Sequence, residues 1–385
     1  MPPNTFTAHS NSSAKMDVSL QTYPLPKEVE PCVLDELWKP CRPQPDVLSL
    51  MAQKPNLRTY FSRYYSYNCL RFSRDGGIHI SIKTHSDVIG LARSILQDST
   101  RAMIFANHNL DITNAVSNSH ATNIINAAEK DASNNHTTAL RTALDLCARL
   151  ITMCDFGHPE FGFSARSSSH WKSHQTLRQA TAEYFHPEKK LQPDNPRLRR
   201  LFTARHLACI GGIRIRWTTN LMDHLLLSDD DRAVFIFHHA DFLRYQSCLA
   251  DQIFPDGFVD ETLRTLTLLF PQNDGKSRRW LVKQISEFSL DPSLSRCGNA
   301  WAQDRRFEKF SFWHDRLVIL KQTFDDSSPR KLSQWWGDRR NSAQWYTFWV
   351  AILVFVTTVF FGLVQSIEGA LQVYLSWKTI QQGDG

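Results

Sequence analysis

One apolar run dominates the C-terminal part of the chain. It reads WYTFWVAILVFVTTVFFGLV from Trp345 to Val364 and contains no charge, no Asn and no Gln. As an α-helix, such a run of about 20 residues would be about 30 Å long, which matches the hydrocarbon core of a bilayer. A buried helix of a water-soluble domain normally keeps a polar stripe at helical period, and this run has none. The pattern therefore predicts one transmembrane helix over 345–366.

Aromatic side chains crowd the start of this predicted span, as expected of rings that prefer the headgroup region. The residues predicted to hold the helix in the bilayer are Trp345, Tyr346, Trp349, Phe355, Phe360 and Phe361. After the span, Ile367 and Leu371 lie opposite Glu368 and Gln372 at helical spacing. Residues 367–385 are therefore predicted to form a short amphipathic tail in the far interface.

Basic residues are more frequent before the span than after it. Residues 330–344 form a predicted basic and aromatic juxtamembrane segment with Trp335, Trp336, Arg339 and Arg340, whereas Lys378 is the one basic residue after the span. This asymmetry predicts a cytosolic N-terminal side. Because few residues follow the span, we expect insertion after synthesis and a tail-anchored topology, with the sequons at Asn11 and Asn135 unmodified.

The rest of the chain has the composition of a globular protein, with 42% hydrophobic and 21% charged residues. Residues 1–45 are rich in Pro and Ser and are predicted to be disordered. Residues 46–329 are predicted to form a mainly helical cytosolic region with a small antiparallel β-meander (α+β), with a possible sub-boundary near 155–190. Eight cysteines without a CxxC pair indicate free thiols in a reducing compartment.

The meander is predicted from residues 213–237. Ile213, Ile215 and Trp217 alternate with polar residues, and two further apolar runs, at 225–227 and 234–237, flank the acidic turn Asp229–Asp231. Helices followed by a short antiparallel sheet are also the order of a winged-helix unit. Upstream, the pattern predicts two helices within 114–154, interrupted near 133–135, and a helix over 171–185.

A further helix is predicted from an apolar stripe at a/d spacing. Its members are Phe310, Trp313, Leu317, Leu320 and Phe324. A stripe of about two heptads is short for a coiled coil, so a core-packing helix is favoured over an oligomerisation seam.

Positive charge is concentrated between residues 189 and 216. Eight basic residues accompany the single acid Asp194 there: Lys189, Lys190, Arg197, Arg199, Arg200, Arg205, Arg214 and Arg216. In a membrane-tethered domain this patch could bind anionic lipid headgroups. The plainer interpretation is a solvated face paired with acids such as Asp229–Asp231. Nucleic acid is not expected, because no pattern of base-stacking aromatics accompanies the charge.

The sequence carries no catalytic signature, no cofactor motif and no strong metal motif. His170 and His174, four apart on a predicted helix, could bind a metal together with Cys154 and His158. With 15 histidines in the chain such pairs arise easily by chance. His224, His238, His239 and Asp241 could instead cap the sheet, because no nucleophile context accompanies them.

Two segments carry a family resemblance. The stretch from Gln334 to Tyr374, and IGGIRIRWTTNLMDHLLLSDDDRAVFIFHHADFL with FPDGFVDETLRTLTLLFPQ within 198–271, resemble a family of uncharacterised single-pass membrane proteins of filamentous ascomycete fungi. The resemblance implies a fungal membrane protein and carries no catalytic assignment.

Together these observations predict a membrane-anchored, non-catalytic interaction or scaffold module with an unknown protein partner. The main alternative is an oligomeric channel or transport subunit with a distant outline of the CorA type. That alternative lacks the second span and the Gly-Met-Asn signature of CorA transporters. A membrane-tethered enzyme would need a pocket lined by His and Asp with perturbed pKa values.

Overall fold

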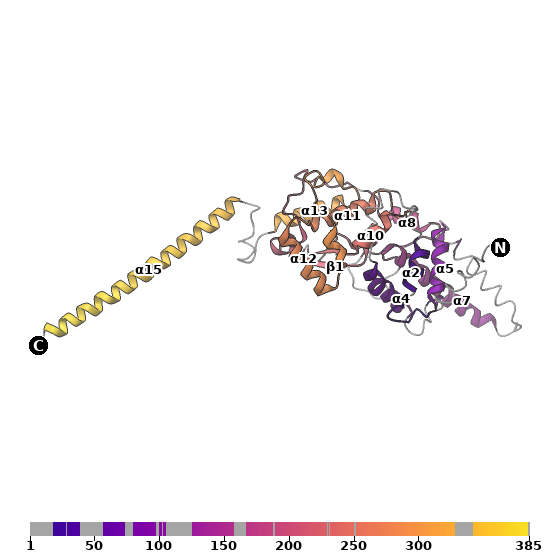
Figure 1. Ribbon diagram of the computed structural model, residues 1–385, viewed down its shortest axis with the longest axis horizontal. Helices are drawn as coiled ribbons and strands as arrows, with labels where there is room; N and C mark the ends of the chain where they lie inside the picture. The colour runs from indigo at the N-terminus through magenta and orange to yellow at the C-terminus, as the bar shows by residue number, and fades with distance from the viewer. Residues whose placement is uncertain are drawn as a thin grey trace, which may run out of the picture. The chain divides into compact units, whose positions relative to one another are not determined.

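The computed structural model describes residues 18–27, 29–38, 57–73, 80–97, 100–101, 103–104, 125–157, 167–187, 189–228, 230, 232–249, 252–327 and 342–383. By their internal contacts, these residues divide into a folded body and a C-terminal part that holds one long helix, α15 (Ser342–Gly383) (Figure 1).

Helices make up most of the described body, as the sequence predicted. They are α2 (Val29–Leu37), the π-helix η1 (Tyr60–Tyr65), α4 (Ser66–Phe72), α5 (His85–Leu96), α7 (Ile125–Thr152), α8 (Leu177–Tyr184), α9 (Ala204–Cys209), the 3-10 helix η3 (Leu221–Asp223), α10 (Ala240–Ser247), α11 (Phe258–Leu269), α12 (Gly275–Phe288), the 3-10 helices η4 (Pro292–Arg296) and η5 (Phe307–Lys309), and α13 (His314–Asp326).

A three-stranded mixed sheet lies among these helices, so the predicted antiparallel meander is wrong. Its strands are β1 (Arg214–Thr218), β2 (Leu227–Ser228) and β3 (Ala233–Phe237), in the order β1-β3-β2. The outer strand β1 pairs with β3 in parallel, and β2 pairs with β3 in antiparallel fashion. The chain leaves β1 at its carboxyl end, passes through η3 and returns along the far side of β3 as β2. The parallel pair also excludes the winged-helix outline.

Burial explains why β3 takes the central place. All five of its side chains are buried, whereas β1 alternates between exposed and partly buried positions. A short continuous apolar run suits a strand that is covered on both faces, and an alternating strand suits an edge. A meander would have left the apolar run AVFIF at an edge.

The second half of the N-terminal segment is folded, so the prediction of disorder is wrong for that part. Val29, Val33 and Leu37 recur at helical spacing on α2 and are almost fully buried. Trp38 follows them and packs edge-on against Phe242 of α10, with ring centroids 5.7 Å apart. The apolar stripe of α2 therefore outweighs the surrounding Pro and Ser content. The remaining positions of 1–45 lie outside the described residues.

Two helix boundaries also differ from the predictions. The backbone of α7 runs without a break through 133–135, where an interruption was predicted. The chain at 171–176 is not helical, because Thr176 caps the start of α8 through a reciprocal hydrogen-bonded box with Gln179. This box satisfies backbone N–H groups that a longer helix would have satisfied internally.

The stripe around α13 belongs to the core of the body. Its five side chains are at most 3% exposed, although the first two precede the helix. Glu261 of α11 fixes this approach, because its carboxylate accepts hydrogen bonds from the backbone N–H groups of Ser311, Phe312 and Trp313. The core-packing interpretation of the stripe is confirmed.

Candidate functional site

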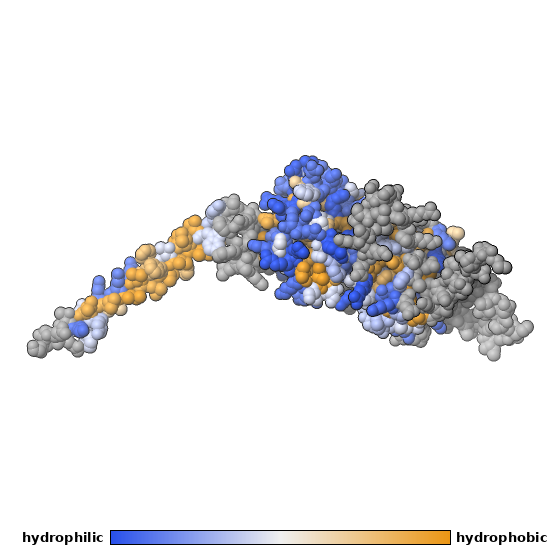
Figure 2. Space-filling view, viewed as in Figure 1, coloured by the Kyte–Doolittle hydropathy of each residue, from blue (hydrophilic) through white to orange (hydrophobic). Residues whose placement is uncertain are grey.

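The strongest candidate is α15, which the sequence predicted as a membrane span. Its stretch Tyr346–Lys378 has 33 residues, and by length and composition it could cross a bilayer; no other described helix meets this test. None of its most apolar window is buried. At 1.5 Å per residue, 33 residues span about 50 Å, more than the hydrocarbon core and close to a bilayer with its headgroups. Figure 2 shows hydrophobic residues along most of this helix.

Polar groups inside this stretch bond to their own helix. The hydroxyls of Thr357 and Thr358 donate to the carbonyls of Leu353 and Val354 at 2.8 Å, and Ser366 does the same to Gly362 at 2.9 Å. In hydrocarbon, where water is absent, polar groups need such internal partners. The helix therefore meets the hydrogen-bond requirement of a lipid environment at these three side chains.

The predicted anchoring residues can be placed individually. Tyr346, Phe355, Phe360 and Phe361 are between 57% and 69% exposed, and Trp349 is half-buried beside Phe348. Trp345 belongs to α15, but its side chain is outside the described set. The juxtamembrane residues Trp335, Trp336, Arg339 and Arg340 lie outside the described residues. The predicted far-side tail is a direct continuation of α15, which runs to Gly383.

The predicted basic patch is divided among several elements. Lys189 and Lys190 are held next to α13, where Asp315 accepts the backbone N–H of Lys190. Arg214 and Arg216 project from the edge strand β1, and the Arg216 guanidinium lies 5.7 Å from the Phe235 ring centroid. The other four members, Arg197, Arg199, Arg200 and Arg205, precede or begin α9.

The structure adds two arginines that the sequence analysis missed. Residues 197 and 306 form an antiparallel β-bridge, and the backbone N–H of Leu198 donates to the carbonyl of Arg305 at 2.8 Å. This pairing brings Arg305 and Arg306 beside Arg197. Burial first, and then the nearby Arg200 guanidinium, lower the pKa of Arg305. The signal in the sequence was the Arg-Arg pair at 305–306. Because this pair lies about 100 positions after Arg197, the sequence pattern did not reveal the contact between them.

The histidines at the carboxyl end of β3 form a buried structural network. His224 is fully buried; its Nδ1 accepts the N–H of Phe237 at 3.2 Å and its Nε2 lies 2.7 Å from Thr265 Oγ1. Because Nδ1 is an acceptor, the proton belongs on Nε2. Burial, with Arg316 adding to it, lowers the pKa of His224 to about 3. The expectation that these histidines cap the sheet is confirmed for His224.

His238 and His239 follow β3 and stack with ring centroids 4.1 Å apart. The Nδ1 of His238 accepts the N–H of Asp291, and burial lowers the pKa of His238 to about 3. His239 is also buried, and burial lowers its pKa well below the usual range. The two rings are therefore neutral at physiological pH, so they cannot serve as cationic binding groups.

Asp241 and Asp291 meet at the start of α10. Asp291 accepts the N–H of Asp241 at 2.9 Å and the N–H of Ser293 at 2.9 Å, while Arg244 donates to Asp241 at 3.1 Å. Burial raises the pKa of Asp291 to about 6, against the lowering effect of its hydrogen bonds. These contacts join α10 to η4 and leave no activated nucleophile in the group.

The metal candidate at 154–174 is not assembled in the described residues. His170 and His174 are exposed on a loop, so they do not share a helix face. The Cys154 thiol is buried, bonds to the carbonyl of Thr152, and has a pKa that burial raises well above its usual value. His158 lies outside the described residues, and among those described no three His, Cys, Asp or Glu side chains form a group that could hold a metal ion.

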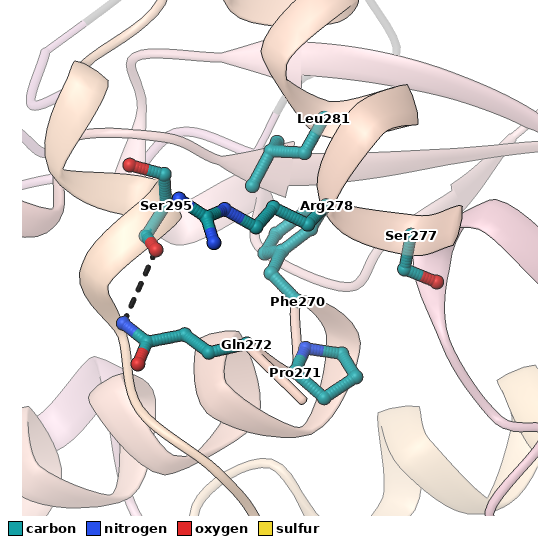
Figure 3. Close-up of a pocket in the computed structure, with 7 residues that line it drawn as sticks. All are labelled: Phe270, Pro271, Gln272, Ser277, Arg278, Leu281 and Ser295. Atoms are coloured by element: carbon teal, nitrogen blue, oxygen red, sulfur yellow. Dashed lines mark hydrogen bonds between the residues drawn. The ribbon is translucent and has the colours of Figure 1, made fainter. Parts of the chain in front are cut away.

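A shallow pocket lies where α11 ends and α12 begins (Figure 3). Gln272 donates to the carbonyl of Ser295 on one side, and the Arg278 side chain extends across the opening. The pocket encloses about 10 Å³, room for about one water molecule. Small-molecule sites usually begin at roughly 300 Å³, so this pocket carries no argument for a ligand.

No family model, curated protein or solved structure matches this chain. The resemblance to fungal membrane proteins therefore stays a prediction.

Proposed function

We propose that this protein is a single-pass membrane protein that α15 anchors, and that its body acts on the cytosolic side as a non-catalytic interaction module. The observation that carries the proposal is the outward-facing apolar surface of Tyr346–Lys378. Water would solvate such a surface poorly, at a cost of about 25 cal/mol per Å² of apolar area, whereas lipid tails solvate it without that cost.

The environments of the histidines and of Asp241 and Asp291 in the body favour an interaction role over catalysis. The imidazoles of His224, His238 and His239 are buried and neutral, and Asp241 and Asp291 join secondary-structure elements. A catalytic acid or base needs access to a reacting group, and a metal or a cleft usually provides the place for it. Free cysteines, such as the exposed Cys209, support a reducing compartment for the body. The basic residues before the span support the same orientation.

Alkaline carbonate extraction tests the anchor. Membranes from cells that express the full chain should retain it in the pellet at high pH, and Triton X-114 should carry it into the detergent phase. The control variant lacks residues 342–383 and should be released. Recovery of the full chain in the carbonate supernatant would refute membrane anchoring.

Affinity capture from detergent-solubilised native membranes tests the interaction role. The full chain should retain a stoichiometric protein partner through repeated washing. A clean monomer in mild detergent would contradict the interaction module. The alternative, an oligomeric transport subunit, predicts self-crosslinking in membranes and would be excluded by monomer alone.

A further inference from the structure

Trp301 is the most exposed large apolar side chain among the described residues. Its exposed fraction is 75%, whereas Trp38, Trp171 and Trp313 in the same body are at most 2% exposed. An exposed indole adds little to the stability of a fold, and Trp is enriched at interfaces where one end of the ring is apolar and the other is wet.

The backbone holds Trp301 in a fixed loop. Its N–H donates to the Asp304 carboxylate at 2.9 Å, and the N–H of Asp304 donates back to the Trp301 carbonyl at 3.1 Å. The Arg305 guanidinium closes the base of the loop through two hydrogen bonds to the carbonyl of Ala300, at 3.2 and 3.3 Å. The loop therefore displays the indole on a rigid frame.

Arginines surround the base of this loop. The β-bridge between residues 197 and 306 is flanked by hydrogen bonds from Leu198 to Arg305 and from Phe307 to Pro196, which lock the two segments together. We call this the Trp301 surface, and its members are Trp301, Arg197, Arg199, Arg200 and Arg306. Arg305 is buried and supports the loop.

The Trp301 surface carries more positive charge than its own acids balance. The Asp304 carboxylate acts on Arg305, whose pKa it raises against burial and Arg200, and Glu308 pairs with Arg306 at 3.6 Å. Arg199 and Arg200 are exposed, and in the described part of the chain no carboxylate lies within ion-pair distance of either. Burial first, and then the Arg200 guanidinium, lower the pKa of Arg305, as expected where guanidinium groups lie near one another.

We propose that the Trp301 surface is a second membrane contact, at which the indole enters the interface of an anionic bilayer and the arginines bind lipid headgroups. Trp prefers the boundary between hydrocarbon and headgroups. Each basic side chain near an anionic leaflet contributes to binding, and guanidinium matches phosphate geometry. The combination of one ring with flanking arginines fits this boundary.

A bilayer fits this surface better than nucleic acid. Single-stranded nucleic acid is held by several aromatic rings on which successive bases stack. The next two aromatic residues along the described chain, Phe307 and Phe310, are at most 2% exposed, so neither offers a second platform. The proposal also rests on the proposed function, because α15 would keep the body near a membrane.

Hydrogen exchange of the full chain in lipid nanodiscs tests the contact. Discs of phosphatidylcholine alone are compared with discs that contain 30% phosphatidylserine. Exchange of the backbone amides in 197–201 and 299–306 should be about tenfold slower in the anionic discs. Exchange within α11, a buried reference helix, should be the same in both.

Two variants and matched controls make the result specific. Arg199→Glu with Arg200→Glu should abolish the protection, and Trp301→Ala should reduce it by about half or more. Two control variants should leave the protection unchanged. One is Tyr67→Ala, at another exposed aromatic residue. The other is Arg71→Glu with Lys83→Glu, which makes the same charge change elsewhere. Unaltered melting temperatures confirm folding, since the changed side chains are exposed or half-exposed.

Three results would overturn the proposal. Equal exchange in both kinds of disc, or protection that survives the double arginine variant, would show that the surface does not bind anionic lipid. Stronger protection by single-stranded RNA in neutral discs would assign the surface to nucleic acid.

If the chain fails to enter discs, the proposed function fails. The Trp301 surface is then tested by sedimentation of the full chain with phosphatidylserine vesicles, where loss of binding in the arginine variant is still expected.

Discussion

The body and α15 contain the same kinds of large apolar side chain and place them in opposite ways. Trp313 in the body is 2% exposed, and Trp377 on α15 is 58% exposed. Phe258 is fully buried among other rings, whereas Phe355 is 69% exposed. The body satisfies the hydrophobic effect by folding apolar groups against one another. Most of the described side chains on α15 are exposed instead, so this helix presents apolar groups of the kind that the body buries.

The polar groups of the two regions follow the same contrast. In the body, His224 and Glu261 reach the backbone of other elements and hold these elements together. On α15, the hydroxyls of Thr357 and Thr358 reach only their own helix. Hydrogen bonds in the body therefore fix tertiary structure, whereas those of Thr357 and Thr358 satisfy polar groups within α15 itself.

The largest effect should come from charging the centre of α15. Val356→Arg with Phe360→Arg places two guanidinium groups near the middle of the predicted span, each costing about 3 kcal/mol for insertion. Most of the variant should move from the carbonate pellet to the supernatant, while the body keeps its fold. Tyr67→Arg with Met103→Arg adds the same charges to the body and should stay in the pellet. If the α15 variant stays in the carbonate pellet like the unaltered chain, the proposed contrast between the body and a lipid-solvated α15 is wrong.

Acid should unfold the body and spare α15. Burial lowers the pKa of His85 to about 4 and those of His224 and His238 to about 3. Their imidazoles are neutral when folded and take up protons on unfolding below their usual pKa of about 6.5, so stability falls as the pH falls below that value. His239 acts in the same direction.

Asp291 opposes this trend. Its pKa is raised to about 6 in the folded body, so below pH 6 the folded state holds a proton that the unfolded state releases. Glu30, Asp145 and Glu261 also have raised pKa values and act in the same direction as Asp291. The four histidines take up protons on unfolding from a higher pKa, about 6.5, than these carboxyl groups, so they act first as the pH falls. Urea unfolding in detergent, followed by tryptophan fluorescence, should show falling stability from pH 6.5 to 5. A stability that rises over this range would contradict the neutral histidines.

Truncation of two tryptophans in the body should change the free energy of unfolding by very different amounts. Trp313→Ala removes a buried ring and the hydrogen bond from Nε1 to Thr262 Oγ1 at 2.8 Å, so it should lower the free energy of unfolding by about 3–5 kcal/mol. Trp301→Ala should change it by about 0.5 kcal/mol or less, because that ring is exposed. Urea unfolding of the two variants provides the comparison. Equal losses would mean that the Trp301 ring is packed.

The smallest effect should come from neutralising Glu261. Glu261→Gln replaces a carboxylate that accepts three backbone N–H groups before α13 and should cost about 1–3 kcal/mol. Glu308→Gln, whose side chain is 72% exposed and pairs with Arg306, is the matched control and should cost about 0–1 kcal/mol. The same urea assay measures both, and identical midpoints would show that Glu261 does not organise the approach to α13.

Local patterns predicted those parts of the structure that depend on neighbours in sequence. The apolar run at 345–364 became a continuous helix, and the stripe from Phe310 to Phe324 became a buried face of α13 and its approach. The alternation of 213–217 predicted strand β1. In each case the period of the side chains is set by the element itself.

Features that depend on distant pairing were not predictable in the same way. The order β1-β3-β2 follows from burial of β3 on both faces, which a run of five apolar residues does not distinguish from an edge strand. The Trp301 surface depends on a bridge between residues 197 and 306. The stripe of α2 was hidden by Pro and Ser around it, because composition averages over a segment while packing acts on single residues.

Glycosylation mapping tests most directly whether α15 crosses the bilayer. An acceptor sequon on a flexible linker after Gly385 is expressed in microsomes together with the native sequons at Asn11 and Asn135. Crossing with the body on the cytosolic side predicts a glycan on the added sequon, none on the native ones, and complete digestion of the body by external protease. Glycan on Asn11 or Asn135, or an unmodified added sequon on a chain that carbonate releases, would contradict the account.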